Sequence, residues 1–375
     1  MNIALFSRVL FLSGVTTHLI DLSNELIKKG HNVYIFTAGA QNPNNEANVR
    51  LADRLEATGA KIIKINFPLT STNKTSYLVS MLRSVAVVAK ELKKNNIDVI
   101  HIHTPALSFI PIILRRKFVK TVHIKDLALS FLDKKASHEI VISRETYDEA
   151  IRKFHYKENE ITLIFNGVAE SFAKTISNND KNNFKETKNI PKDKIIIGIV
   201  GSVQYRKGHD ILLEAVSQLR NDLKNKVHLI ILGEGSETEE IWLKDLIKKF
   251  NLESTISKFG FQDPKSYYDI MDIFVLPSRL EGFPLVAIEA MLSNCCVIRS
   301  DTEGAYDQIE PGVSGLLFKN ESIAELTKQL EFAINNEPER IKIAAAGREY
   351  ALDNFTAEKM TEKTIAVYEK ISQGY

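Results

Sequence analysis

Short apolar runs rich in β-branched residues alternate with amphipathic runs along nearly the whole 375-residue chain. In the first half, the predicted strands are residues 3–6, 32–36, 61–65, 99–102, 119–122 and 139–142. Between the first two lies a predicted helix over 19–29, in which Leu19, Leu22 and Leu26 recur at helical spacing and Gly30 supplies a left-handed cap. Strands that are apolar throughout are typical of parallel sheets covered on both faces. The alternation predicts a doubly wound α/β domain.

The alternation stops in a polar segment and then resumes, which predicts a second domain of the same class. Its strands are expected at 195–200, 227–232, 256–259, 273–276 and 296–299. We expect an N-terminal domain over 1–170, joined by a returning terminal helix over 356–375, a linker over 171–193 and a second domain over 194–355. Ligands of such folds bind beyond the carboxyl ends of the strands, so the cleft between the domains is the expected site.

Several classes of protein are disfavoured by composition. No run of eighteen apolar residues predicts a membrane-spanning helix, and the start of the chain lacks the features of a signal peptide. The only cysteines, Cys295 and Cys296, are adjacent, which suits two small buried side chains in a reducing compartment better than a disulfide or a zinc site. We therefore expect a cytoplasmic protein.

Positive charge is concentrated in the first half of the chain. Residues 1–170 hold 23 lysines and arginines against 16 acids, while the rest of the chain holds 26 against 31. Five of these cations follow the apolar run 109–114: Arg115, Arg116, Lys117, Lys120 and Lys125. They form either a solvated face or a surface that contacts anionic lipid at the inner face of the cell membrane. Nucleic acid is not expected, because no aromatic residues are interleaved with the charges.

The motif richest in chemistry begins at the predicted strand 273–276 and ends in a helix that starts near Pro284. Proline suits the first turn of a helix, and Gly282 allows the backbone to approach a ligand closely. Free N–H groups around Phe283 to Val286 could hold a diphosphate. Glu281 lies in the loop and Glu289 in the helix, and carboxylates accept hydrogen bonds from sugar hydroxyls. A capping glutamate and an exposed helical glutamate would be the alternative.

This segment resembles the E-x7-E motif of the retaining glycosyltransferases of family four, which have the GT-B fold. The resemblance extends over nearly the whole chain. It implies that Glu281 contacts the transferred sugar and that Glu289 contacts the ribose of the donor. Donor contacts are also implied for a further set of residues: Gly14, Ser202, Phe261, Gly282, Phe283, Pro284 and Leu285.

The loop after strand 195–200 resembles the family's diphosphate-binding loop. Lys207 matches the lysine of its Lys-Gly pair, whereas Ser202 stands where the family usually has arginine. Arg206 could supply the missing charge, and two cations would stabilise a departing diphosphate without a metal. A solvated basic turn is the alternative. No D-x-D motif is present, so neither a metal nor another cofactor is expected beyond the substrate, a UDP- or GDP-sugar.

Histidines end two neighbouring predicted strands of the first domain. His101 and His103 lie at 99–103, and His123 follows strand 119–122. The resemblance assigns His123 to the transferred sugar. His18 and His103 are candidates for the acceptor side. For His101 the sequence leaves two interpretations open: a buried structural residue or a residue of the site.

The resulting expectation is a retaining, metal-independent transfer of a hexose or N-acetylhexosamine to a glycan or polyprenyl-linked acceptor, in bacterial surface polysaccharide or glycolipid synthesis. Lys207 and Arg206 would stabilise the leaving diphosphate. Three alternatives stay open: a nucleotide-sugar epimerase of the same fold, a catalytically inactive donor-binding protein, and a dinucleotide oxidoreductase. The oxidoreductase needs a G-x-G-x-x-G fingerprint that neither half shows.

Overall fold

The structure is a computed structural model that describes residues 1–11, 13–41, 44, 46–65, 74–123 and 133–372, without the side chains of 46–47 and 74–78. Lys125, one of the five clustered cations, lies outside these residues. The chain divides into two compact units, which we call unit 1, Met1–Gly167 with Ala357–Tyr375, and unit 2, Val168–Thr356.

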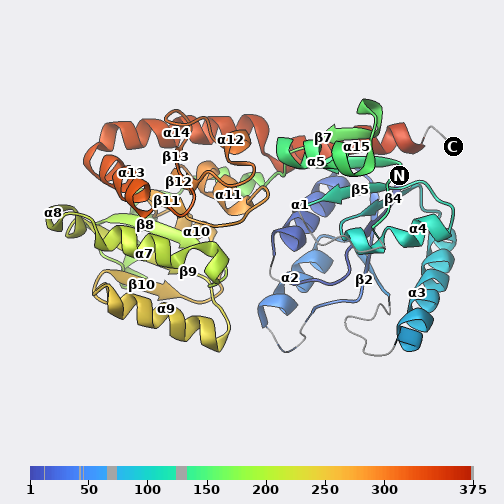
Figure 1. Ribbon diagram of the computed structural model, residues 1–375, viewed down its shortest axis with the longest axis horizontal. Helices are drawn as coiled ribbons and strands as arrows, with labels where there is room; N and C mark the ends of the chain where they lie inside the picture. The colour runs from blue at the N-terminus through green and yellow to red at the C-terminus, as the bar shows by residue number, and fades with distance from the viewer. Residues whose placement is uncertain (12, 42–43, 45, 66–73, 124–132, 373–375) are drawn as a thin grey trace. The chain divides into compact units, whose positions relative to one another are not determined.

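Unit 1 contains a parallel sheet that, within the described residues, has seven strands in the order β3-β2-β1-β4-β5-β6-β7. Figure 1 labels four of them, β2, β4, β5 and β7. The strands are β1 Asn2–Phe6, β2 Asn32–Thr37, β3 Lys61–Lys64, β4 Val99–Ile102, β5 Val119–Val122, β6 His138–Val141 and β7 Ile161–Leu163. From β1 the chain first adds strands toward one edge of the sheet, β2 and β3, and then toward the other edge, starting with β4. The chain connections that follow β1 and β4 therefore lead toward opposite edges. Side chains ending these central strands are therefore placed where doubly wound folds bind ligands.

The helices of unit 1 follow the strands as the alternation predicts. They are α1 Gly14–Lys28, α2 Glu46–Ala57, α3 Lys74–Lys94, α4 Phe109–Ile113, α5 Arg144–Phe154 and α15 Ala357–Ser372, with short 3-10 turns η1 Pro105–Leu107 and η2 Glu158–Glu160. Helix α1 starts at an N-cap, Ser13, and Gly30 beyond its end has a φ of 81°, the left-handed conformation expected from the sequence.

The terminal helix α15 belongs to unit 1, as the expected fold requires. Lys29 Nζ lies 2.9 Å from Glu362 Oε1, and the Tyr368 hydroxyl lies 2.6 Å from His101 Nδ1. Residues more than 250 positions apart are thus in contact within unit 1. The predicted return of the C-terminal helix to the first domain is confirmed.

Unit 2 repeats the architecture with six described parallel strands in the order β10-β9-β8-β11-β12-β13. The strands are β8 Ile195–Val200, β9 Val227–Leu232, β10 Ile256–Phe259, β11 Ile273–Leu276, β12 Cys296–Ser300 and β13 Leu316–Phe318. The helices are α6 Asn178–Thr187, α7 His209–Ser217, α8 Asn221–Lys224, α9 Glu237–Lys249, α10 Lys265–Tyr268, α11 Leu285–Leu292, α12 Ala305–Gln308, α13 Ile323–Asn335 and α14 Glu337–Asn354, with 3-10 turns η3 Glu170–Ala173 and η4 Tyr205–Lys207.

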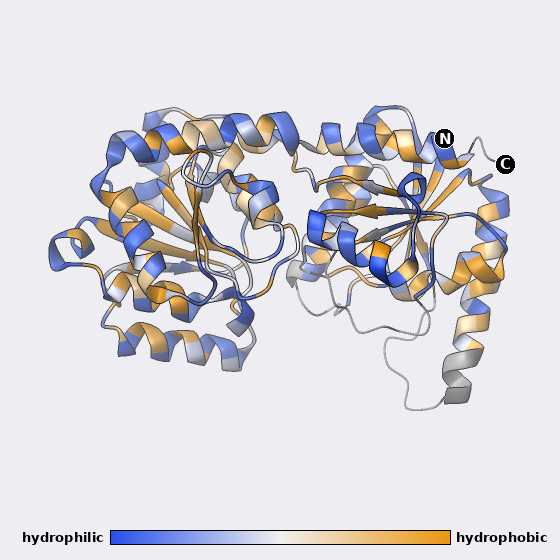
Figure 2. Cartoon of the chain, turned by 45° about the horizontal axis from the view of Figure 1, so that its top comes forward, coloured by the Kyte–Doolittle hydropathy of each residue, from blue (hydrophilic) through white to orange (hydrophobic). Residues whose placement is uncertain are grey.

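Figure 2 shows the strands of both sheets as mainly hydrophobic and the helices as two-sided. In unit 2, one core cluster joins side chains of β8, β9, β11 and β12 to those of α7, α9 and α13. This distribution explains why continuous apolar runs form strands here: helices cover the sheet, so both faces of the central strands are buried.

The polar segment expected to be a linker has regular structure of its own and belongs to unit 2. It contains η3 and α6, and α6 is started by Ser177, whose hydroxyl accepts a hydrogen bond from the Asp180 N–H at 3.2 Å. Its polar composition reflects a surface helix without a fully buried residue rather than an unstructured connection.

The cluster of five cations is also different from the expectation, because Lys120 is not at the surface. Lys120 lies inside β5 with no exposed side-chain area, and its ammonium is 3.0 Å from both Asp133 Oδ1 and Glu139 Oε2. A lysine within a buried parallel strand must be paired, so Lys120 belongs to a buried group of ion pairs instead of contributing to an exposed basic face.

Both cysteines are free thiols buried in unit 2, as the sequence predicts. The residue before them, Asn294, has a φ of 65°, and the Cys295 thiol lies 3.3 Å from the Tyr268 carbonyl oxygen.

Candidate functional site

The loop after β11 and the start of α11 lie at the carboxyl ends of the unit 2 strands. Pro284 is the N-cap of α11 rather than its first helical residue, with ψ of 122°. The first backbone N–H groups of α11, beginning at Leu285, consequently have no carbonyl acceptor within the helix. Together with the helix dipole they favour an anion at this end.

Glu281 and Lys207, predicted from separate motifs, form a direct ion pair. Lys207 Nζ donates to Glu281 Oε1 at 2.6 Å, and the two side chains are 14% and 9% exposed. Burial raises the pKa of Glu281, but the Lys207 ammonium, together with the Ser278 side chain and the charge of Arg206, outweighs burial and holds that pKa below its ordinary value. The carboxylate is therefore charged at neutral pH and joins the loop after β8 to the loop after β11.

Glu289 is buried too, on the second turn of α11, and has a neutral partner. The Tyr268 hydroxyl donates to Glu289 Oε2 at 2.9 Å. Burial and the nearby Glu289 raise the pKa of Tyr268 well above its ordinary value, so the phenol remains a donor. Glu289 is accordingly not the exposed helical glutamate of the alternative interpretation.

Arg279 fixes the loop that carries Glu281, a role that the sequence interpretation missed. Its guanidinium makes a two-pronged contact with Asp210, at 2.9 and 2.7 Å, and donates to the Tyr205 carbonyl at 2.7 Å. The Arg279 N–H also donates to the Arg206 carbonyl at 2.8 Å. The loops of Lys207 and Glu281 are thus held together by backbone and side-chain contacts.

Two glycines permit these loops to pack. Gly208 has a φ of 72°, and a Cβ there would lie 1.9 Å from the Pro277 carbonyl oxygen. Gly304 has a φ of 71°, and a Cβ there would lie 2.4 Å from the Gly282 carbonyl oxygen. The loops after β8, β11 and β12 therefore approach so closely that only glycine fits at either position.

The other predicted donor residues of unit 2 differ in how they could contact a ligand. Arg206 is exposed, and its Nε donates to Gln204 Oε1 at 3.1 Å; it lies near enough to lower the pKa of Glu281. Ser202 and Phe261 are half-buried in the loops after β8 and β10. The side chains of Phe283 and Leu285 are buried, so these residues could contact a donor only through the backbone, as could Gly282.

Unit 1 brings three of its four candidate residues together. His18 of α1, His103 after β4 and His123 after β5 have ring nitrogens that all lie within 4.8 Å of one another. The closest pair is His103 Nδ1 and His123 Nε2, at 3.2 Å. The fourth residue, Gly14, is exposed at the first position of α1, one turn before His18.

Burial keeps these histidines neutral. It lowers the pKa of His18 to about 4, although the Asn166 side chain raises it, and it lowers the pKa values of His103 and His123 well below the ordinary value. His101, in contrast, is a structural residue, because its two ring nitrogens lie 2.6 and 2.7 Å from the hydroxyls of Tyr368 and Thr121.

Comparisons with known proteins agree with this architecture. The family model "Glycosyltransferase Family 4" matches residues 12–172, and "Glycosyl transferases group 1" matches 180–350. An uncharacterized glycosyltransferase of Methanocaldococcus jannaschii is 22% identical over 95% of this chain and 94% of that protein. CapM, a capsular polysaccharide biosynthesis glycosyltransferase of Staphylococcus aureus, is 27% identical over 62% and 61%. Anabaena HepE in complex with UDP-glucose shares the fold, with a TM-score of 0.82 at 20% identity over 99% and 100% of the two chains. The chain is a GT-B glycosyltransferase.

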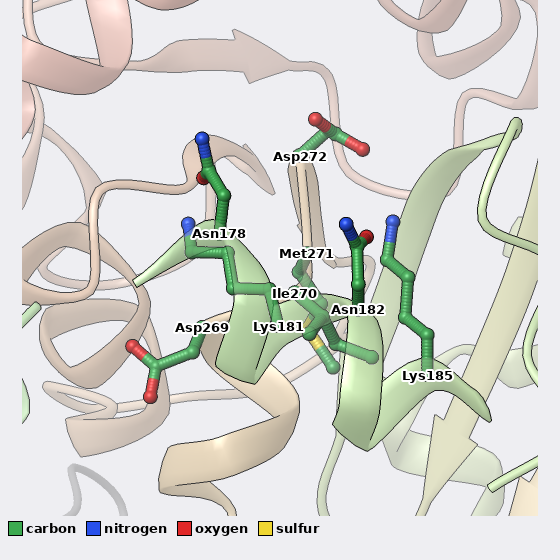
Figure 3. A pocket seen from close by; sticks show the side chains of 8 residues that line it. All are labelled: Asn178, Lys181, Asn182, Lys185, Asp269, Ile270, Met271 and Asp272. Atoms are coloured by element: carbon green, nitrogen blue, oxygen red, sulfur yellow. The ribbon is translucent and has the colours of Figure 1, made fainter. Parts of the chain in front are cut away.

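A separate hollow in unit 2 of this glycosyltransferase lies away from the motif. It has a volume of about 340 Å³ and lies between α6 and the residues preceding β11, including Lys185, Asp269 and Asp272 (Figure 3). Because Asp272 precedes β11 whereas Glu281 follows it, the hollow is at the amino end of the strand. It is therefore distinct from the candidate donor residues of the glycosyltransferase.

Proposed function

We propose that this glycosyltransferase moves a hexose or N-acetylhexosamine, with retention of anomeric configuration, from a UDP- or GDP-sugar to a glycan or polyprenyl-linked acceptor. Capsular polysaccharide synthesis by a relative supports a surface glycan as the product class. The observation that carries the donor assignment is the buried pair of Lys207 and Glu281, 2.6 Å apart, in which the glutamate lies four residues before the start of α11.

In this proposal, unit 2 binds the donor. Lys207 and Arg206 contact the diphosphate, assisted by the first N–H groups of α11. Glu281 accepts hydrogen bonds from sugar hydroxyls, and Glu289, held by Tyr268, accepts them from the ribose. Without a ligand, Lys207 and Glu281 neutralise each other. When the donor binds, this ion pair is replaced by two contacts, one between Lys207 and a phosphate and one between Glu281 and a sugar hydroxyl.

The chemistry requires cations at the leaving group rather than a protein nucleophile. The bond between the anomeric carbon and the diphosphate oxygen breaks, and the acceptor oxygen forms a bond to that carbon on the same face. The acceptor proton passes to the departing phosphate oxygen. Lys207 and Arg206 stabilise the charge that develops there, so a metal is not needed for this step. Unit 1 contributes His123 to the sugar and His18 and His103 to the acceptor.

We also propose that unit 1 contacts the inner face of the cell membrane, where a polyprenyl-linked acceptor would be presented. In the described part of the chain, no helix is both long and apolar enough to cross a bilayer. Exposed apolar side chains nevertheless occur on α3 and α4, among them Leu82 and Ile113, and exposed cations Arg115 and Lys117 follow α4. Apolar side chains with flanking cations suit an anionic membrane surface.

The donor assignment is tested by thermal unfolding in the presence of a panel of nucleotide sugars. We expect one UDP- or GDP-sugar to raise the melting temperature of the wild type, because a ligand that binds only the native state stabilises it. Glu289→Gln and Lys207→Met should reduce the shift. Glu349→Gln, which changes an exposed helical glutamate in the same unit, should retain it. A panel without any stabilising sugar nucleotide, or an unchanged shift in Glu289→Gln, would contradict the assignment.

Incubation of the stabilising donor with and without acceptor separates the alternatives. A transferase releases nucleoside diphosphate as it forms a glycoside, and NMR of the product shows whether the anomeric configuration is retained. An epimerase of the same fold changes the sugar without any acceptor, and an inactive donor-binding protein does neither.

A further inference from the structure

We propose that His18, His103 and His123 of unit 1 form a zinc-binding site. They come from three different elements, α1 and the ends of β4 and β5, so the fold rather than local sequence brings them together. Their ring nitrogens already lie within 4.8 Å of one another.

The spacing of the closest two nitrogens matches that of zinc ligands. Zinc binds imidazole nitrogen at about 2.0–2.1 Å with tetrahedral geometry, which separates two ligand atoms by about 3.3 Å. His103 Nδ1 and His123 Nε2 are 3.2 Å apart. All three ligand atoms lie within 4.8 Å of one another, so the wider spacings need to close by at most about 1.5 Å to complete a three-nitrogen face.

Unused nitrogens in the cluster point to a ligand. Among the described residues, neither ring nitrogen of His18 makes a hydrogen bond of ordinary geometry, although the Asn166 side chain lies near enough to raise the pKa of His18. His18 is 5% exposed. A buried ring nitrogen without a well-formed hydrogen bond costs free energy, and zinc bound to that nitrogen would remove the cost.

The electrostatics and the surroundings suit a metal as well. Neutral imidazole, not imidazolium, coordinates zinc, and burial disfavours protonation of all three rings. His103 packs against His101, at 4.0 Å between ring centroids, and His101 is fixed by Tyr368 and Thr121. The cluster is therefore backed by a rigid partner, which limits the reorganisation needed to bind.

Three histidines leave a fourth zinc position for water or for a substrate hydroxyl. Zinc bound to His123 would remove that ring from the sugar, so we expect zinc to inhibit transfer. This consequence rests on the proposed function, whereas the binding itself does not.

The direct test is calorimetric titration of zinc into the full-length, metal-free chain without an affinity tag. We expect one equivalent to bind. His18→Gln and His103→Gln should each weaken binding by more than about 100-fold, beyond the 10–100-fold typical of partners outside the coordination shell. Two control variants, His155→Asn at an exposed cap and His31→Gln beside the amino terminus, should bind as the wild type does.

A measurement on the wild type guards against variants that misfold. One equivalent of cobalt, which can replace zinc, should give the intense visible absorption of a tetrahedral site, and zinc should displace it. The inference is overturned by any of three results: no zinc uptake, uptake unaffected by His18→Gln and His103→Gln, or only the faint spectrum of octahedral cobalt.

The transfer assay then distinguishes the two proposals. Zinc should lower the rate of transfer and a chelator should restore it, while stabilisation of unit 2 by the donor persists. If the chain transfers no sugar at all, the proposed function fails, but the calorimetric result remains valid evidence for or against the zinc site.

Discussion

Glu281 and Glu289 are both buried acids, yet their partners give them different properties. Glu281 faces an ammonium and is held charged by it. Glu289 accepts a hydrogen bond from the neutral Tyr268 hydroxyl, which fixes its orientation. One glutamate must therefore exchange a charged partner when a ligand arrives, whereas the other is already oriented.

Tyr268 should consequently position Glu289 for the donor. Tyr268→Phe removes one hydrogen bond, a loss of about 0.5–1.5 kcal/mol. We expect the nucleotide sugar to bind about tenfold more weakly, equivalent to about 1.4 kcal/mol. Calorimetry with the donor measures the change. Tyr267→Phe is the matched control, because the Tyr267 hydroxyl donates to Gln262 instead, at 2.7 Å. Equal weakening in both variants would argue against a positioning role.

The sequence revealed site residues whose context is local and missed those whose partners are distant. Glu281 and Glu289 lie within one continuous strand–loop–helix segment, so the sequence alone predicts that they belong to one site. Tyr268 meets Glu289 from another element, 21 positions away, and the only signal in the sequence is that a buried tyrosine generally needs a hydrogen-bond partner. Arg279 meets Asp210 across 69 positions, and no local pattern encodes that contact.

At the scale of single elements, α3 carries several exposed apolar side chains. Val79, Leu82 and Val87 are 47%, 57% and 40% exposed, and Arg83 and Lys90 are exposed on the same helix. Val79 and Leu82 are three residues apart, so they are neighbours on the helix surface, whereas Val87 is five residues beyond Leu82. These exposed side chains give the proposed membrane contact an identifiable surface.

The membrane proposal predicts that wild-type protein sediments with vesicles containing an anionic lipid and less with neutral vesicles. Leu82→Glu combined with Ile113→Glu should lower the bound fraction, because it replaces apolar contact with repulsion. Ile241→Glu introduces the same charge at an equally exposed isoleucine of α9 in unit 2, and should bind normally. Undiminished sedimentation of the double variant would exclude these helices as the contact.

Helices and strands differ in how well the sequence predicts them. The long alternating segments were predicted within a few residues, but β7 and β13 were missed because each has only three residues. Helix α6 was taken for part of a linker because of its polar composition. Its Ser177-to-Asp180 spacing is nevertheless a start signal for a helix. Lys120 was assigned to the surface because its partners, Asp133 and Glu139, are set by the fold.

For the whole molecule, the buried histidines of unit 1 make stability depend on pH. A histidine whose pKa is lowered by folding takes up a proton more readily when unfolded, so its stabilisation is complete above about pH 6.5 and is lost as pH falls toward the folded pKa. For His18 that pKa is about 4. Between pH 7 and pH 5, His18 alone should account for a loss of about 2 kcal/mol in the free energy of unfolding.

Urea unfolding at pH 7 and pH 5, monitored without added metal, measures this dependence. His18→Asn should reduce the loss on acidification, and His155→Asn, at an exposed position, should leave it unchanged. A wild-type stability that is equal at the two pH values would show that the cluster is not held neutral by burial.

The paired cysteines of unit 2 have a practical consequence for solution chemistry. Cys295 and Cys296 are both buried, and burial raises the pKa of the Cys296 thiol to about 12 and that of Cys295 further. Since only the thiolate reacts appreciably with alkylating reagents, the native chain should be nearly inert toward them. Alkylation then proceeds no faster than unit 2 opens. The rate of alkylation of the wild-type chain therefore measures how fast unit 2 opens. Because the two native thiols do not react, a single cysteine introduced at the surface would be the one site that takes up a thiol-reactive spectroscopic label.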